Sequence, residues 1–349
     1  MTPVSYKSGI YRALLLVAAL FIVLAGLKTA ANILVPFLLS LFIAIVCSPI
    51  VRKIESFKVP KPLAVLAVIV VFVTVVVYIV GLVGRSLMDL SQLLPDYLAQ
   101  LKHELTWVVD KLAEYNIIIS RELIAEYFNP GVAMRLVADT LSGLGGLMTS
   151  LFLIAVTVVF MLFEASSLPK KVYLALDEPD VKMQQIDRFL SSVNHYLAIK
   201  TLVSIATGVA VTIMLWAFGL EFYLLWGVLA FLLNYIPNIG SIIAAVPAIL
   251  LAVLQLGLVP ASFVGIGYLV INVIMANLIE PRYLGRGLGL STLVVFLSLV
   301  FWGWLLGSAG MLLSVLLTMV IKIGLENSQD GKWLAILLSG DVAEKSRRT

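Results

Sequence analysis

The sequence has few charged residues, one cysteine and two histidines, and each shortage excludes a class of protein. Charged residues make up 13% of the 349 positions, against about 25% in a soluble globular domain, so they are too few to cover a soluble surface. Cys47 stands alone, which excludes an intrachain disulfide and a cysteine metal cluster. His103 and His195 are far apart in the sequence and make a poor metal site. We therefore expect no metal and no cofactor.

Several motifs of catalysis are also lacking. The chain has no Walker A phosphate loop, no HExxH zinc motif and no GxSxG nucleophile elbow. Gly287-x-Gly289-x-Ser291 places a serine after glycines, but without that spacing or a nearby base. The net charge of +4 comes from basic residues beside apolar segments, which is typical of membrane orientation and not of nucleic-acid binding. We expect no catalytic residues, no enzymatic activity and no nucleic-acid partner.

Long apolar runs are what the sequence has in abundance, with 61% hydrophobic residues. Runs of about 18 residues or more recur, and each can cross a hydrocarbon core of about 30 Å. Lipid allows only helices or closed barrels to span it, and the runs have helical length. The pattern predicts an all-α, polytopic membrane protein surrounded by lipid, with about eight transmembrane segments. Those before residue 219 are expected at 10–27, 29–51, 62–84, 147–164 and 197–218.

The first two segments raise the question of a secretory signal, because Lys7 and Arg12 precede the first apolar run. A second run follows almost at once, which favours a membrane helix and a short hairpin turn at Gly26 and Lys28 over a cleaved peptide. The loop at 52–61 is strongly basic, and lysine and arginine in short loops favour the cytoplasmic side. Both chain termini are then expected in the cytoplasm, with 85–146 outside.

Composition divides the chain into five parts: N-terminal transmembrane helices (1–84), an amphipathic extramembrane helical segment (85–146), two further transmembrane helices with a polar loop at 165–195 (147–218), a C-terminal transmembrane core with broken hairpins (219–323) and a polar cytoplasmic tail (324–349). The second part carries a heptad stripe, which indicates an amphipathic helix packed on its own neighbours or, alternatively, a self-association element. The stripe consists of Leu94, Leu98, Leu101, Leu105, Val108 and Leu112. A helix break follows at Asn129-Pro130-Gly131.

The apolar run at 222–256 has a polar interruption in its middle, Asn234-Tyr235-Ile236-Pro237-Asn238-Ile239-Gly240-Ser241. Pro237 removes a backbone donor and disfavours helix in the residue before it. A break at membrane depth is stable only where protein or a water-filled cavity satisfies the exposed backbone, and transporters coordinate solutes at such breaks. We expect a substrate site formed by Asn234, Pro237, Asn238, Gly240 and Ser241.

A second interruption, Gly307-Ser308-Ala309-Gly310, divides the apolar run at 290–321. Its halves are too short to span comfortably, so both 222–256 and 290–321 are predicted to be helical hairpins. Long kinked spans are one alternative, and glycines that only kink helices or permit close packing are another. Arg282 and Arg286, between the two runs, favour the hairpins. In the hairpin interpretation Gly307, Ser308 and Gly310 lie opposite the first break and complete the substrate site.

Polar residues between the two runs form a third candidate group: Asn272, Asn277, Glu280 and Arg282. Ionisable groups inside a membrane are costly and often functional, which favours gating or coupling; the alternative is an interfacial anchor and turn. Glu280 and Arg282 are expected to pair with each other or with the hairpins. Lys200, near the start of the segment at 197–218, is expected to extend its amine to the membrane interface.

The first break, Glu280-Pro281-Arg282 and the run from Gly285 to Gly307 together resemble the autoinducer-2 exporter (AI-2E) family, as do Val35-Pro36-Phe37 and the run from Val158 to Leu162. The resemblance covers nearly the whole chain and is strongest over 222–321. It implies a bacterial inner-membrane protein that exports autoinducer-2, a small furanone-like quorum-sensing signal. It also implies a homo-oligomer, with a pentamer as the suggested form. Some relatives are thought to exchange cations for protons, so the fold does not fix the solute.

Three functional hypotheses follow. The first is export of a small signalling molecule, autoinducer-2, through a site at the two breaks. The second is exchange of sodium or potassium for protons, which requires Glu280. The third is a membrane scaffold or regulator that uses 85–146 and carries no solute.

Overall fold

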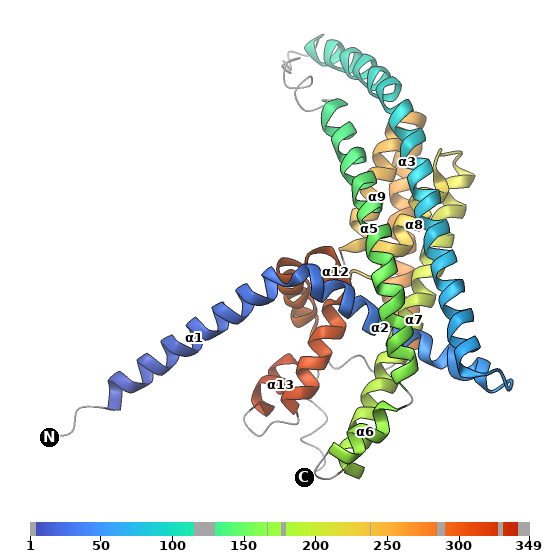
Figure 1. Ribbon diagram of the computed structural model, residues 1–349. Helices are drawn as coiled ribbons and strands as arrows, with labels where there is room; N and C mark the ends of the chain where they lie inside the picture. Colours follow the sequence, from blue (N-terminus) through green and yellow to red (C-terminus); the bar gives the residue numbers. More distant parts are fainter. Residues whose placement is uncertain are drawn as a thin grey trace. The chain divides into compact units, whose positions relative to one another are not determined.

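The computed structural model describes residues 5–114, 130–165, 167–175, 179–237, 239–284, 290–326 and 331–340. These residues form helices joined by short turns, and no strand occurs among them (Figure 1). Within these ranges six helices are long and apolar enough to cross a membrane: Ala31–Glu55, Lys61–Tyr97, Ala138–Glu164, Leu190–Ala217, Leu258–Tyr283 and Thr292–Glu326. Three shorter apolar helices accompany them, at Leu14–Thr29, Tyr223–Leu233 and Gly240–Leu256. The predicted all-α polytopic membrane fold is confirmed.

The first two helices, α1 (Ser5–Thr29) and α2 (Ala31–Glu55), are separated by Ala30 alone. The Ala30 N–H bonds to the Gly26 carbonyl, and the Leu34 N–H bonds to the Ala30 carbonyl, both at 2.9 Å. Helices that fold back on each other need a connection of about two to eight residues. The expected hairpin turn at Gly26 and Lys28 is therefore wrong: the helices continue end to end (Figure 1).

Helix α3 (Lys61–Glu114) runs without a break past residue 84, so the third apolar segment and the start of the amphipathic segment are one helix. A change from apolar to polar residues alters what surrounds a helix without ending it. Leu94 of the heptad stripe is buried, whereas the side chains of its other members and residues 115–129 lie outside the described part of the chain. Helix α5 (Pro130–Glu164) begins at the predicted break, at a proline suited to the first helical position.

The remaining helices follow in close succession. They are α6 (Leu168–Ala175), α7 (Pro179–Ala217), α8 (Tyr223–Leu233), α9 (Gly240–Leu256), α10 (Leu258–Val273), the π-helix η1 (Ile274–Ile279), α11 (Glu280–Leu284), α12 (Thr292–Glu326) and α13 (Lys332–Leu338). Helix α7 begins inside the polar loop expected at 165–195, and so extends well before the apolar segment expected at 197–218.

The chain divides into two compact units. Unit 1 comprises Met1–Pro49, Val156–Val193 and Gly287–Thr349, and unit 2 comprises Ile50–Ala155 and Asn194–Arg286. The first interrupted run lies in unit 2 and the second in unit 1, and each is described by itself. The division of the sequence into five successive parts stays a prediction.

Helices α8 and α9 form an antiparallel hairpin in unit 2. The Glu221 N–H, just before α8, donates to Gln255 Oε1, near the end of α9, across 3.0 Å. The Tyr97 hydroxyl of α3 donates to the Glu221 carboxylate and joins α3 to this open end. Alanines let α9 pack closely within the unit: Ala244, Ala248 and Ala252 are fully buried in its apolar core. We call this pair of helices the first hairpin, with its tip at 234–239.

Helix α12 bends back on itself at Gly307, which has φ 70° and ψ −151°. The Trp302 indole Nε1 donates to Thr318 Oγ1 across 3.0 Å. In a straight helix, 16 residues cover about 24 Å, so the bond requires the two halves to lie side by side. The second interrupted run is therefore also a hairpin, as predicted.

Candidate functional site

The tip of the first hairpin is a compact turn that bonds to itself. The Ile236 N–H bonds to the Leu233 carbonyl at 2.9 Å, and the Ile239 N–H bonds to the Pro237 carbonyl at 2.7 Å. Gly240 begins α9 directly beneath the Leu233 carbonyl, where an added Cβ would collide with it. The turn thus satisfies much of the backbone that Pro237 frees from the helix, which is the condition for a break in a membrane span.

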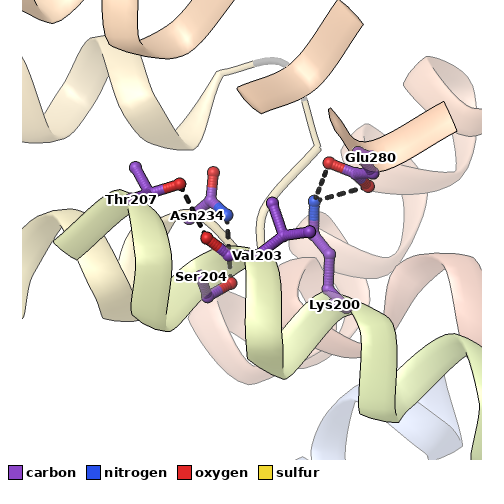
Figure 2. A network of polar contacts seen from close by, with 6 residues as sticks. All are labelled: Lys200, Val203, Ser204, Thr207, Asn234 and Glu280. Atoms are coloured by element: carbon purple, nitrogen blue, oxygen red, sulfur yellow. Dashed lines mark hydrogen bonds and ion pairs between the residues drawn. The ribbon is translucent and has the colours of Figure 1, made fainter. Parts of the chain in front are cut away.

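Two side chains of the tip bond to hydroxyl groups of α7. The Asn234 amide donates to Ser204 Oγ across 3.0 Å, as Figure 2 shows. The Tyr235 hydroxyl donates to Thr201 Oγ1 across 2.8 Å. Ser204 is fully buried, and within the described residues its hydroxyl proton has no acceptor. The tip is therefore held against a polar stretch of α7 that lies in the middle of an apolar helix.

A buried ion pair lies on the same stretch of α7. Lys200 Nζ lies 2.9 Å from Glu280 Oε1 and 3.0 Å from Oε2 (Figure 2). The Lys200 side chain is 6% exposed and the Glu280 side chain 21%. Both residues lie in helices long and apolar enough to span a membrane. A charge pair placed there is costly and points to function.

The ion pair corrects two expectations. Lys200 does not extend its amine to an interface, because the amine is bonded to both Glu280 carboxylate oxygens and its side chain is buried. Glu280 pairs with Lys200 and not with Arg282, whose side chain is exposed. The π-helix η1 ends directly before Glu280. Such π turns are frequent at functional sites. This one sets the position of Glu280 around the helix axis.

The other predicted site residues differ in their burial and in whether they contact this surface of α7. Pro237 and Ser241 are half-buried at the tip, Gly240 is buried, and Asn238 lies outside the described residues. Asn272 is half-buried in α10, whereas Asn277 is exposed in η1. Within the described chain neither asparagine is hydrogen-bonded to the tip. The structure thus joins Asn234 and Glu280 to one α7 surface but does not join Asn272, Asn277 or Arg282 to it.

The second break forms its own turn in unit 1. Gly307 and Ser308 are exposed, whereas Gly310 is buried and packs so closely on Trp302 that a Cβ would collide with the Trp302 carbonyl. Lys28 Nζ lies 4.3 Å from the centre of the Trp304 ring, a cation–π contact. The role of Gly307, Ser308 and Gly310 in a shared substrate site stays a prediction.

Sequence reasoning did not place three residues of this candidate site: Lys200, which it assigned to the membrane interface, and Thr201 and Ser204, which it did not name. Their signal was a lysine followed by hydroxyl residues at 201, 204 and 207 inside an apolar helix. Hydroxyl groups in such helices commonly bond to their own backbone, as Thr207 does to the Val203 carbonyl at 2.8 Å. Only the contacts with Asn234, Tyr235 and Glu280 distinguish the first three residues from Thr207.

Comparison with known proteins shows the family of this chain. The family model described as AI-2E family transporter matches residues 14–330. The AI-2 transport protein TqsA of Escherichia coli K12 is 43% identical, covering 97% of this chain and 98% of its own length. A putative transport protein of Haemophilus influenzae is 45% identical over 96% of this chain and 98% of its own length, and YhhT of E. coli K12, a putative transport protein, is 42% identical over 99% of both. The chain belongs to the AI-2E family of membrane transporters.

Proposed function

We propose that this protein exports a small, uncharged signalling molecule, autoinducer-2, across the bacterial inner membrane. The name of the E. coli relative, AI-2 transport protein, supports the solute. The family and the long apolar helices support a multi-pass transporter without enzymatic activity. Both chain termini are proposed to lie in the cytoplasm, and the protein is proposed to act as a homo-oligomer, with a pentamer as the form that the family resemblance suggests.

One observation carries the choice of solute class: the charges on the α7 surface that holds the hairpin tip cancel. Lys200 and Glu280 neutralise each other through both carboxylate oxygens, and their neighbours Asn234, Ser204 and Thr201 are uncharged hydrogen-bonding groups. Buried polar groups that lack partners favour a ligand that supplies them. A neutral molecule rich in hydroxyl and carbonyl oxygens fits this surface, because it accepts from Ser204 without adding charge.

Asn234, Pro237, Asn238, Gly240 and Ser241 are proposed to bind the solute, together with Ser204 and Thr201. Gly307, Ser308 and Gly310 are proposed to complete the site from the second hairpin. Asn272, Asn277 and Arg282 are proposed to act with Glu280 in gating. The cation exchanger is the weaker hypothesis, since it needs a carboxylate that is free to take a cation, and Glu280 is occupied by Lys200.

The direct test is efflux from proteoliposomes of purified protein loaded with autoinducer-2, compared with protein-free liposomes. We expect faster efflux with the protein, and slower efflux for Asn238→Ala than for the wild type. Ser262→Ala is the matched control, because the Ser262 hydroxyl is exposed on α10 and, among the described residues, bonds only to the Leu258 carbonyl of its own helix. Efflux equal to that of protein-free liposomes, from correctly folded protein, would refute the proposed solute.

A further inference from the structure

The Lys200 ammonium lies where a metal cation would bind at Glu280. It is nearly equidistant from the two carboxylate oxygens, at 2.9 and 3.0 Å (Figure 2). Hard metal cations bind carboxylates through one or both oxygens. Lysine carries one positive charge, as sodium and potassium do. The side chain therefore occupies both the position and the charge of a bound monovalent cation.

The low exposure of both side chains makes loss of the lysine charge costly. With 6% of Lys200 and 21% of Glu280 exposed, a carboxylate left alone would be an uncompensated charge in an apolar surrounding, which is strongly unfavourable. Such a carboxylate recovers its stability only by binding a cation or a proton. Removal of the lysine charge therefore creates a demand for a proton or a mobile cation at the same place, and the oxygen atoms around the carboxylate favour the cation.

The neighbouring groups would meet that demand. Tyr196 of α7 lies close enough to Glu280 to interact with its charge, and Tyr235 of the tip bonds to Thr201, the residue after Lys200. Both tyrosines supply oxygen, as do the hydroxyl groups of Thr201 and Ser204 further along α7. Within the described residues Lys200 is the cation bonded to Glu280, since Arg282 is exposed on α11.

We propose that Lys200 is a specificity-determining residue whose ammonium serves as a built-in cation, so that the site excludes sodium and potassium and carries a neutral solute without them. The inference rests on the proposed transport function and deepens it. It predicts that the wild type is an exporter independent of both cations. It also predicts that loss of the lysine charge alone converts the site into one that binds a monovalent cation.

The test compares the wild type with Lys200→Met, which keeps an unbranched side chain of nearly the same length and removes its charge. Proteoliposomes are assayed for autoinducer-2 efflux in sodium, potassium or choline, and for uptake of radioactive sodium. Wild-type efflux is expected to be the same in all three salts, without sodium uptake. For K200M we expect efflux about tenfold faster in sodium or potassium than in choline, within the usual range of coupling between two ligands, together with sodium uptake.

Two further variants separate charge from structure. Lys200→Arg keeps the charge and is expected to remain independent of cations. The double variant K200M/E280Q removes both charges and is expected to lose the cation dependence of K200M. Wild-type efflux that requires sodium or potassium, K200M efflux that ignores both, or equal cation dependence in K200M and the double variant would each overturn the proposal.

The folding of K200M is informative in itself. Recovery of folded protein only in sodium or potassium supports the proposal, whereas loss of K200M in every salt, with K200M/E280Q folded, overturns it. Failure of the proposed function is recognised separately. If the wild type exports no autoinducer-2, uptake of radioactive sodium by K200M still reports on Lys200, because that measurement needs no organic solute.

Discussion

Asn234 and Ser204 are joined by a hydrogen bond of 3.0 Å between the amide nitrogen and the hydroxyl oxygen, and this contact attaches the tip of the first hairpin to α7. Ser204 is fully buried, so its hydroxyl has no easy substitute in water. The Tyr235 hydroxyl makes a parallel contact with Thr201 at 2.8 Å. The tip is thus fixed by side-chain bonds in addition to its own backbone turn.

We predict that Asn234→Ala lowers autoinducer-2 efflux about tenfold, because a buried group left without its partner costs about 1–3 kcal/mol. Ser204→Ala removes the other partner of the same bond and is expected to have a similar effect. The double variant N234A/S204A should then lose much less than the sum of the two. Efflux from proteoliposomes measures all three, with Ser262→Ala as the control. Additive losses would show that the two residues act independently.

The crossing of α7 and α8 leads to a second prediction. A Cβ added to Gly227 would lie 2.9 Å from the Gly208 carbonyl and would overlap Thr212 Oγ1. Gly227→Ala should therefore destabilise the protein by about 1–3 kcal/mol, the usual cost of overpacking, and lower its thermal unfolding midpoint in detergent. The added variant Thr212→Ala removes one obstacle, so G227A/T212A should recover part of the loss.

The control for Gly227 is Gly265→Ala in α10. There the nearest atom to an added Cβ is Ile249 Cδ1 at 3.6 Å, an ordinary contact. Alanine is also the better helix former, so this variant should unfold at or above the wild-type temperature. If G227A and G265A unfold at the same temperature, the close crossing of α7 and α8 is not what stabilises the hairpin.

The third prediction concerns the second hairpin, in which Trp302 Nε1 donates to Thr318 Oγ1. Thr318→Val keeps the shape of the side chain and removes the acceptor, which should cost about 0.5–1.5 kcal/mol because the part-buried indole N–H loses its partner. Against a Trp302→Phe background the same change should cost little, since no donor remains. Thermal unfolding of the four proteins measures the difference, and an equal cost in both backgrounds would contradict the bond.

The sequence predicted both hairpins because their signals are local. Pro237 and Gly240 interrupt one apolar run and Gly307 the other, and the constraints on proline and glycine operate within a few residues. The Lys200–Glu280 pair was not predicted, because 80 residues separate its members and no local pattern brings them together. The join between α1 and α2 was mistaken for a turn because hydropathy shows where apolar segments change and not whether the helix folds back there.

Gly307 provides the last prediction. With φ 70° and ψ −151° it occupies a backbone region essentially restricted to glycine, and an added Cβ would meet no atom within 4 Å. Backbone strain is therefore the whole cost of Gly307→Ala, about 1–3 kcal/mol. Gly307→Asn should cost the same, because asparagine tolerates left-handed helical backbone but not this region.

Gly324→Ala is the control. Gly324 lies in the regular part of α12 with equally open surroundings, so this substitution should instead stabilise the protein by about 0.5–1 kcal/mol. Thermal unfolding should therefore rank G324A above the wild type and both Gly307 variants below it; equal midpoints for G307A and G324A would mean that the turn at 307 does not require glycine.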